Sequence, residues 1–264
     1  MMRYNPALGG LKLNAKDAEK FAQASALSMQ NLRRMAILMT PSTGDEGFLQ
    51  NILGVLKVDN TKKYLAHYQH AIQVWQDLLG RSESPNLMKM EASEVTVNGL
   101  QGIRISMDMK SLMQAQNPPP QASQMIEKMF GEDGKVTTHI IAADENTILL
   151  SYASAEAIDK KVATYLKSKA RLATEPGIAK IASLLGQQPG MVAYLSPQGT
   201  VAWISQIMQM ALPPGVTVPE FPEFPKTLPI GFSAKMVADG FETELVVPAE
   251  LPRVFKDFAQ SIKR

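Results

Sequence analysis

The sequence predicts an α+β protein with large, mainly antiparallel sheets and helices packed on one side of them. A unit of two strand-like runs followed by a helix occurs three times along the 264-residue chain. A hairpin places its two strands antiparallel, so each copy predicts an antiparallel pair. Polar and apolar residues alternate from Glu94 to Val97, as in a strand with one solvated face. Antiparallel strand pairs with helices packed against the sheet predict the α+β class.

The three copies follow one another with other elements between them. They comprise strands 35–39 and 52–58 with helix 61–79, strands 136–142 and 147–152 with helix 155–167, and strands 230–237 and 241–247 with a helix that follows Pro248 and ends at Ile262.

The first copy has a helix before it and contains the clearest helix of the chain. Asn14 is expected to cap the preceding helix, with Asp17 at its positive end. In the copy itself, Asp59 and Asn60 give the start signal for the helix at 61–79. Its apolar residues recur every three or four positions and predict one buried face. They are Tyr64, Tyr68, Ala71, Ile72, Trp75, Leu78 and Leu79.

A further hairpin lies between the first and second copies. Asn98-Gly99 joins strands 94–97 and 102–107, and both residues of this dipeptide tolerate the positive φ of a tight turn. A helix is predicted at 121–130, followed by a turn at 131–134.

Between the second and third copies the sequence predicts a short helix that residues 174–177 open and that runs through Leu185, a strand at 191–195 and a helix from Pro197 to Met210. Residues 212–229 contain six prolines, which predict an extended crossover outside any sheet interior. We expect residues 1–264 to form a single domain, with sub-halves 1–134 and 135–264 as the alternative division.

Composition excludes several classes of protein. The net charge is +2 and no Lys/Arg run exceeds two residues, which argues against a nucleic-acid groove. The absence of cysteine excludes disulfides, thiolate metal sites and cysteine nucleophiles, and mildly favours an exported protein. No apolar stretch approaches the roughly 20 residues of a transmembrane helix. The first ten residues contain no signal peptide, so an exported chain is expected to be a fragment of a longer precursor, with a cytoplasmic location as the alternative.

No motif for catalysis or cofactor binding is present, and we expect a protein without catalytic residues, cofactor or metal. His67 and His70 have a metal-ligand spacing but no third ligand, and carboxylates such as Glu242 and Glu244 are expected in solvent. The 16 methionines include pairs such as Met208 and Met210, whose thioethers suit Cu(I). Methionine is more often a flexible filler of cores and interfaces.

Two sets of apolar residues are candidates for binding. Met35, Ile37, Trp75, Met107 and Trp203 are expected to line a cavity for an apolar ligand or lipid between sheet and helices. Phe221 and Phe224, in the proline-rich segment, either bind a protein partner or a second copy, or anchor the segment on its own domain.

Three segments carry a resemblance: 150–159, 172–181 and 188–197, the last of which reads Gln-Pro-Gly-Met-Val-Ala-Tyr-Leu-Ser-Pro. The chain resembles a family of uncharacterised bacterial cell-envelope proteins of unknown function. The resemblance implies export and a longer parent protein, and it supplies no activity or site residues. The sequence therefore predicts a non-enzymatic envelope module that acts in structure or in protein interaction. The alternatives are a carrier of an apolar ligand and, third, Cu(I) binding by methionine.

Overall fold

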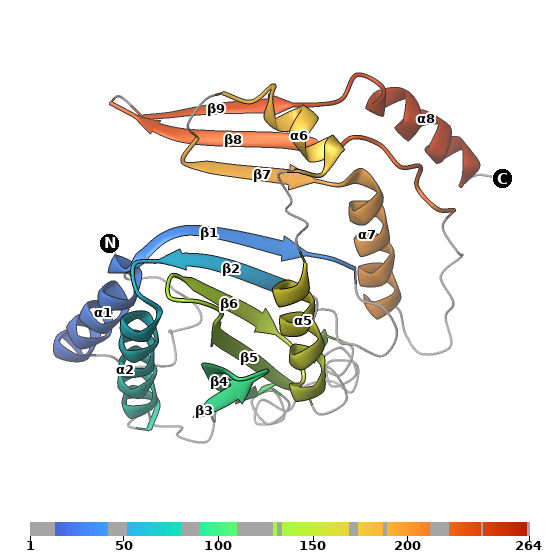
Figure 1. Ribbon diagram of the computed structural model, residues 1–264. Coiled ribbons are helices and arrows are strands. Elements are labelled where there is room, and N and C mark those ends of the chain that lie inside the picture. Colours follow the sequence, from blue (N-terminus) through green and yellow to red (C-terminus); the bar gives the residue numbers. More distant parts are fainter. Residues whose placement is uncertain are drawn as a thin grey trace. The chain divides into compact units, whose positions relative to one another are not determined.

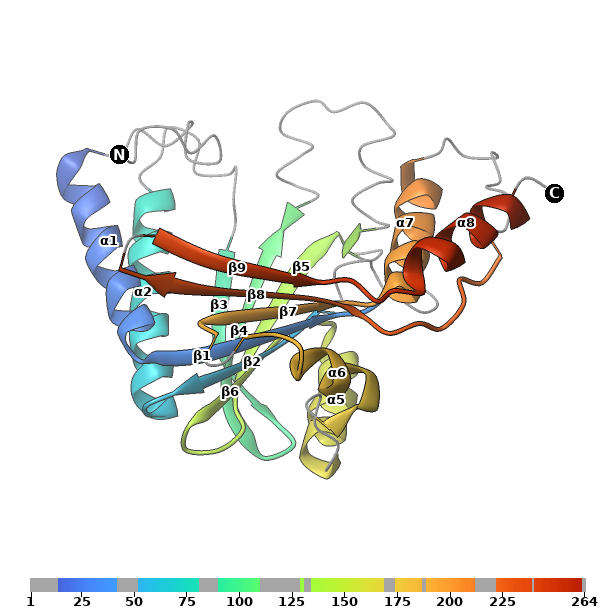
Figure 2. The same ribbon diagram turned by 90° about the horizontal axis from the view of Figure 1, so that it is seen from above.

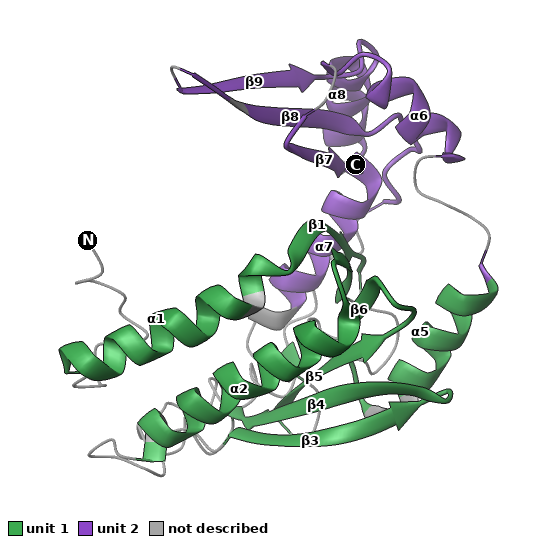
Figure 3. Ribbon diagram, turned by 60° about the vertical axis from the view of Figure 1, so that its left-hand side comes forward, with its two compact units in different colours: residues 1–167 green, residues 168–264 purple. Residues whose placement is uncertain are grey.

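The chain forms two compact units, Met1–Lys167 and Ser168–Arg264, which are coloured separately in Figure 3. The computed structural model describes residues 14–41, 52–80, 90–109, 129–130, 134–168, 174–186, 189–211, 222–238 and 240–262. The structure thus has two units where the sequence predicts a single domain, and the second predicted copy belongs wholly to the first unit, so the chain divides after Lys167 and not after residue 134, the alternative division. Strands from both sides of residue 134 share one sheet.

The first unit is built on a six-stranded antiparallel sheet with the strand order β1-β2-β6-β5-β4-β3 (Figure 1). Its strands are β1 (Leu32–Met39), β2 (Ile52–Val58), β3 (Met90–Val97), β4 (Leu100–Asp108), β5 (Lys135–Ala142) and β6 (Thr147–Tyr152). The first two predicted hairpin copies meet at the centre, where β2 pairs with β6. The additional hairpin, β3–β4, extends the sheet at the side of β5.

The turn between β3 and β4 has the geometry that its sequence predicts. Asn98 and Gly99 have φ values of 52° and 80°. Both are in the left-handed region, which is required at the two central residues of a type I′ turn. The Asn98 side chain also donates a hydrogen bond of 2.8 Å to the carbonyl of Asp159.

Helices α1 (Ala15–Gln30) and α2 (Thr61–Gly80) lie side by side in Figures 1 and 2, and α2 covers one face of this sheet. The Asn14 side chain caps α1 by accepting a hydrogen bond of 2.9 Å from the Asp17 N–H. The predicted apolar stripe of α2 packs into the core through Tyr64 and Ile72. Under it lie buried residues of four strands: Leu56, Val58, Ile103, Ile105, Ile140 and Ile148.

Helix α5 (Ala155–Lys167) packs on the opposite face of the same sheet. Its Ile158 and Val162 pack with Val97, Ile141 and Leu149, and all five are buried. Neighbouring residues of a strand point to opposite faces. Ile140 and Ile148 therefore belong to the α2 core, while Ile141 and Leu149 belong to the α5 core. The expectation that helices pack on one side only is wrong for this unit, although the α+β class is confirmed.

The second unit has a three-stranded antiparallel sheet of order β7-β8-β9. Its elements are α6 (Pro176–Ala182), β7 (Met191–Leu195), α7 (Pro197–Ala211), β8 (Ile230–Val237), β9 (Gly240–Val246) and α8 (Leu251–Ser261). Helix α6 packs against β8 at Gly231, where a Cβ atom would lie 2.3 Å from Ile181 Cγ2. Glycine at this position thus lets the helix approach the strand closely.

Most predicted elements are confirmed in kind, with boundaries that differ by a few residues. The predicted helix at 121–130 falls largely on residues outside those described, as do the first ten positions of the proline-rich segment. Of that segment, the described residues 222–229 have no helix or strand, as its prolines predict.

Candidate functional site

Strand β1 forms one edge of the six-stranded sheet, and its apolar side chains are unusually exposed. In the described chain, β2 is its single strand neighbour. Alternate residues of such a strand direct N–H and C=O groups away from the sheet. The side chains of Met35, Ile37, Leu38 and Met39 are 60%, 58%, 49% and 48% exposed. We call the segment from Arg34 to Met39 the β1 edge.

The register places the side chains of the β1 edge on both faces of the sheet. Met35 pairs with Leu56 and shares the face of the α2 core. Ala36 pairs with Val55 and shares the face of the α5 core. By alternation, Ile37 and Met39 lie on the α2 face, and Arg34 and Leu38 on the α5 face. A strand laid against this edge would therefore meet apolar side chains on both of its faces.

The other edges of the two described sheets have protective features. Charged residues protect an edge strand, and short length limits pairing. Strand β3 carries the exposed Glu91 and Glu94, strand β9 carries the exposed Glu242, and strand β7 has five residues. The β1 edge has no charge from Met35 to Met39. This uncharged run of exposed apolar side chains makes β1 the described edge best suited to accept a strand.

Two arginines at the start of β1 have different surroundings. Arg33 Nε donates a hydrogen bond of 2.7 Å to Asp59 Oδ1, and Arg33 Nη2 also pairs with Asp59 Oδ2. The hydrogen bond from Arg33 lowers the pKa of Asp59 below its ordinary value. Arg34 has no hydrogen-bond or ion-pair partner among the described residues, and its register neighbour is the cation Lys57. The β1 edge thus begins at an exposed positive charge without an acidic partner.

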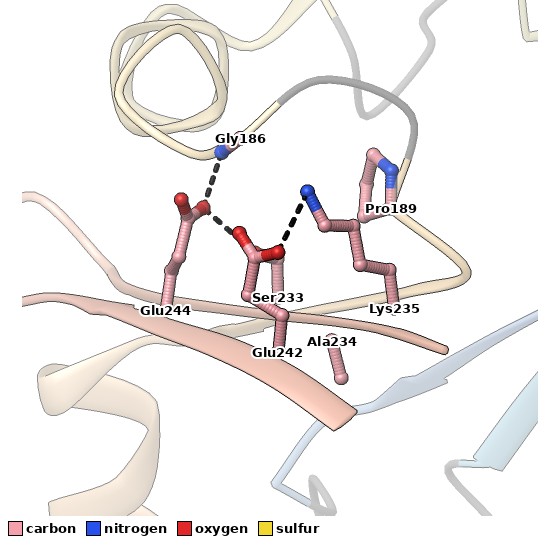
Figure 4. Close-up of a pocket in the computed structure, with 7 residues that line it drawn as sticks. All are labelled: Gly186, Pro189, Ser233, Ala234, Lys235, Glu242 and Glu244. Carbon is pink, nitrogen blue, oxygen red and sulfur yellow. Dashed lines mark hydrogen bonds and ion pairs between the residues drawn. The ribbon is translucent and has the colours of Figure 1, made fainter. Parts of the chain in front are cut away.

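A second polar cluster lies on the face of the three-stranded sheet that α6 covers (Figure 4). Glu244 accepts hydrogen bonds from the Gly186 N–H, just beyond α6, and from Ser233 Oγ at 3.1 Å. Glu242 forms an ion pair of 3.1 Å with Lys235. The cavity between these residues has a volume of about 10 Å³, enough for about one water molecule. This space leaves no room for a substrate, so the cluster fastens α6 to the sheet.

Replacing Glu244 with alanine is expected to destabilise the second unit by about 2 kcal/mol, because the buried Ser233 hydroxyl and the Gly186 N–H lose their acceptor. The matched change Glu242→Ala removes an exposed ion pair and is expected to cost less than about 1 kcal/mol. The two tryptophans, Trp75 and Trp203, lie in different units. Urea unfolding followed by Trp203 fluorescence in a Trp75→Phe background therefore measures the second unit. If the two variants lose the same free energy of unfolding, the result would contradict the role of Glu244 in holding α6 on the sheet.

A groove of about 340 Å³ runs between α1 and α2. Ala24, Leu27, Val74 and Leu78 supply its apolar lining. Its polar lining residues are Asp17, Lys20, Gln23, His70 and Asp77. None of the five residues predicted to line a ligand cavity borders this groove.

The structure places four of those five residues in the first unit and Trp203 in the second. Met35 and Ile37 lie on the exposed β1 edge. Trp75 is half-buried, with its ring centroid 5.0 Å from that of Phe21. Met107 is half-buried near the end of β4, and Trp203 lies on α7 in the other unit. Apolar character alone predicted an interior position, whereas the place of β1 in the strand order exposes two of the five.

Phe224 is buried inside its own unit, so the prediction that it binds a partner is wrong. Its side chain is 2% exposed. Its ring centroid lies 4.9 Å from those of both Phe255 and Phe258 on α8. The proline-rich segment is therefore anchored on its own unit at this residue, which is the alternative that the sequence also offered. Phe221 lies outside the described residues.

His67 and His70, which have a metal-ligand spacing in the sequence, lie on α2 beside α1. His67 Nδ1 lies 3.0 Å from the Asn31 side-chain amide and 3.2 Å from the Leu27 carbonyl, and so links α2 to the end of α1. His70 borders the groove. Within the described ranges, no group of three or more His, Cys, Asp or Glu residues is placed to hold a metal ion. Met208 lies on α7 and is 42% exposed.

His139 is the most deeply buried ionisable residue of the sheet. Its side chain is 1% exposed, and its Nδ1 atom has no hydrogen-bond partner among the described residues. Burial, followed by the charge of Arg104 opposite it on β4, lowers its pKa to about 4, against a smaller opposing effect of Asp159. His139 is therefore neutral at pH 7 and belongs to the core.

Comparison of the chain with protein-family models, with curated proteins and with solved structures finds no match. Among the described residues, no helix is long and apolar enough to cross a membrane.

Proposed function

We propose that this protein is a non-enzymatic interaction module of the cell envelope, which binds a partner protein by adding one of the partner's strands to β1. The observation that carries the proposal is the β1 edge: in the described chain this strand pairs on one side only, with β2, and it has four exposed large apolar side chains. In strand addition, main-chain hydrogen bonds supply affinity and side-chain contacts supply specificity. The envelope setting rests on the sequence resemblance and on the absence of cysteine.

The risk of unwanted strand pairing at an exposed apolar edge supports this function, because a partner strand bound to the edge would prevent such pairing. An exposed apolar edge strand is a template for unwanted pairing, and proteins protect such edges with charges, bulges or covering segments. From Met35 to Met39 the edge has no charge and no proline. Fully burying an aliphatic or methionine side chain is worth about 1.5–3 kcal/mol. A strand that covers several of these side chains therefore gains binding energy besides its main-chain hydrogen bonds.

The test uses a fluorescent, uncharged peptide with valine and threonine at alternating positions. We expect it to bind the full chain and to slow hydrogen exchange of alternate β1 amides. The change Ile37→Lys, which puts a charge in the apolar edge, is expected to weaken binding at least about tenfold. Leu166→Lys makes the same change at a 49% exposed leucine on α5 and is expected to leave affinity unchanged. Fluorescence anisotropy and amide exchange measure both effects.

Equal weakening by both lysine variants would contradict a role for the edge. So would slow exchange of every β1 amide without peptide at all protein concentrations, because the edge would then already be covered.

A further inference from the structure

We infer that the segment accepted by β1 is acidic as well as apolar, with an Asp or Glu opposite Arg34. This inference rests on the proposed strand addition and names the chemistry of the partner. Arg34 is exposed and, among the described residues, has no hydrogen bond or ion pair, while the neighbouring Arg33 is satisfied by Asp59. A guanidinium in this position offers donors in a planar fork that matches a carboxylate.

The register strengthens the case for an anion at this position. Arg34 lies directly opposite Lys57 of β2, so two cations are cross-strand neighbours on the α5 face. Like charges directly opposite one another destabilise a sheet, whereas opposite charges contribute about 0.2–1 kcal/mol. Lys57 donates a hydrogen bond of 2.5 Å to Thr147 Oγ1. Arg34 remains as the cation to which an added strand can supply an acid.

Alternation gives the pattern of the partner segment. Arg34, Ala36 and Leu38 share the α5 face, while Met35, Ile37 and Met39 share the α2 face. A strand paired with this edge therefore places its acidic residue on the α5 face, followed on the same face by apolar residues at every second position. On its other face it carries apolar residues throughout. The matching segment is extended, about six residues long, apolar on both faces and acidic at one end.

A second copy of this chain fits the edge less well. If two β1 strands pair with each other, the partner of each Arg34 also comes from the segment Leu32–Met39, which contains no acidic residue. Self-pairing would cover the apolar side chains and leave Arg34 without a carboxylate. Charge complementarity therefore selects an acidic segment of another protein over a copy of β1.

The experiment compares three peptides that are the same strand, apolar on both faces, except at the end residue that lies opposite Arg34, which is Glu, Gln or Lys. With the full chain, we expect the Glu peptide to bind about threefold to fivefold more tightly than the Gln peptide, and the Lys peptide more weakly than both. The advantage of Glu should shrink at high salt. In the Arg34→Glu variant the order should reverse, so that the Lys peptide binds best. Arg253→Glu, the same charge change on α8 of the second unit, should preserve the original order.

The outcomes separate this inference from the proposed function. Equal affinity of the three peptides, abolished by Ile37→Lys, would overturn the acidic partner and retain strand addition. No binding of any peptide would overturn both. Protection of β1 amides that grows with protein concentration, without peptide, would identify a second copy as the occupant and also overturn the inference.

Discussion

Replacing Ile141 with alanine is expected to destabilise the first unit by about 4 kcal/mol, the largest effect that we predict for a single substitution. The Ile141 side chain is 0% exposed and packs with Val97, Leu149, Ile158 and Val162 in the core between the sheet and α5. Truncation removes buried methyl groups and leaves a cavity. Gly102 of β4, which pairs with Ile141, has no side chain that could fill this cavity.

Urea unfolding followed by Trp75 fluorescence, in a Trp203→Phe background, isolates the first unit in this measurement. Ile37→Ala is the matched control, because the same truncation at a 58% exposed side chain is expected to change stability by less than about 0.5 kcal/mol. A loss below about 1 kcal/mol for Ile141→Ala would contradict the packing of α5 on this face. The experiment therefore tests the second helix-covered face, which the sequence did not predict.

Acidification is expected to destabilise the first unit by about 3 kcal/mol through His139. The ordinary pKa of 6.5 falls to about 4 in the folded protein, because burial and the charge of Arg104 disfavour the imidazolium. An unfolded chain therefore binds a proton at a higher pH than the folded chain does. The neutral His139 side chain makes its full contribution to the free energy of unfolding above pH 6.5. This contribution is lost as the pH falls towards 4. Each pKa unit corresponds to about 1.4 kcal/mol.

The variant His139→Gln cannot titrate, so the difference in pH dependence between it and the parent protein measures this effect. We expect the free energy of unfolding of the parent to fall more steeply than that of the variant between pH 6.5 and 4. Asp59 and Asp144, whose pKa values are also lowered, are common to both proteins, and their contributions cancel in the difference. Urea titrations at several pH values, with Trp75 as the probe, provide the data. Parallel curves would show that His139 does not carry the acid sensitivity.

The local signals of the sequence were sufficient for individual elements. Asn14 caps α1 and Asn98-Gly99 forms its turn because both depend on residues within a few positions along the chain. The periodicity of α2 likewise predicts which of its side chains enter the core. Such features depend on short-range geometry, which a single sequence expresses directly.

The candidate site was predicted only in part. The sequence predicts Met35 and Ile37 as binding residues, but as the lining of an interior cavity. Their exposure follows from the position of β1 at the end of the strand order. The importance of Arg34 depends on its register with Lys57, and that pairing is defined only when the two strands meet. A signal was present in the sequence, namely two arginines followed by five apolar residues, but apolar runs occur in both core and edge strands.

The sequence by itself determined the α+β class, the hairpins and the amphipathic helices, because these depend on periodicity and turn chemistry within short segments. The tertiary structure decided which strands became edges, that α5 covers the face opposite α2, and that the chain divides after Lys167. These features depend on pairings between residues far apart in the chain, such as Leu56 with Ile148. An apolar side chain is equally compatible with a core and with an edge strand, and the neighbours that the fold supplies distinguish the two.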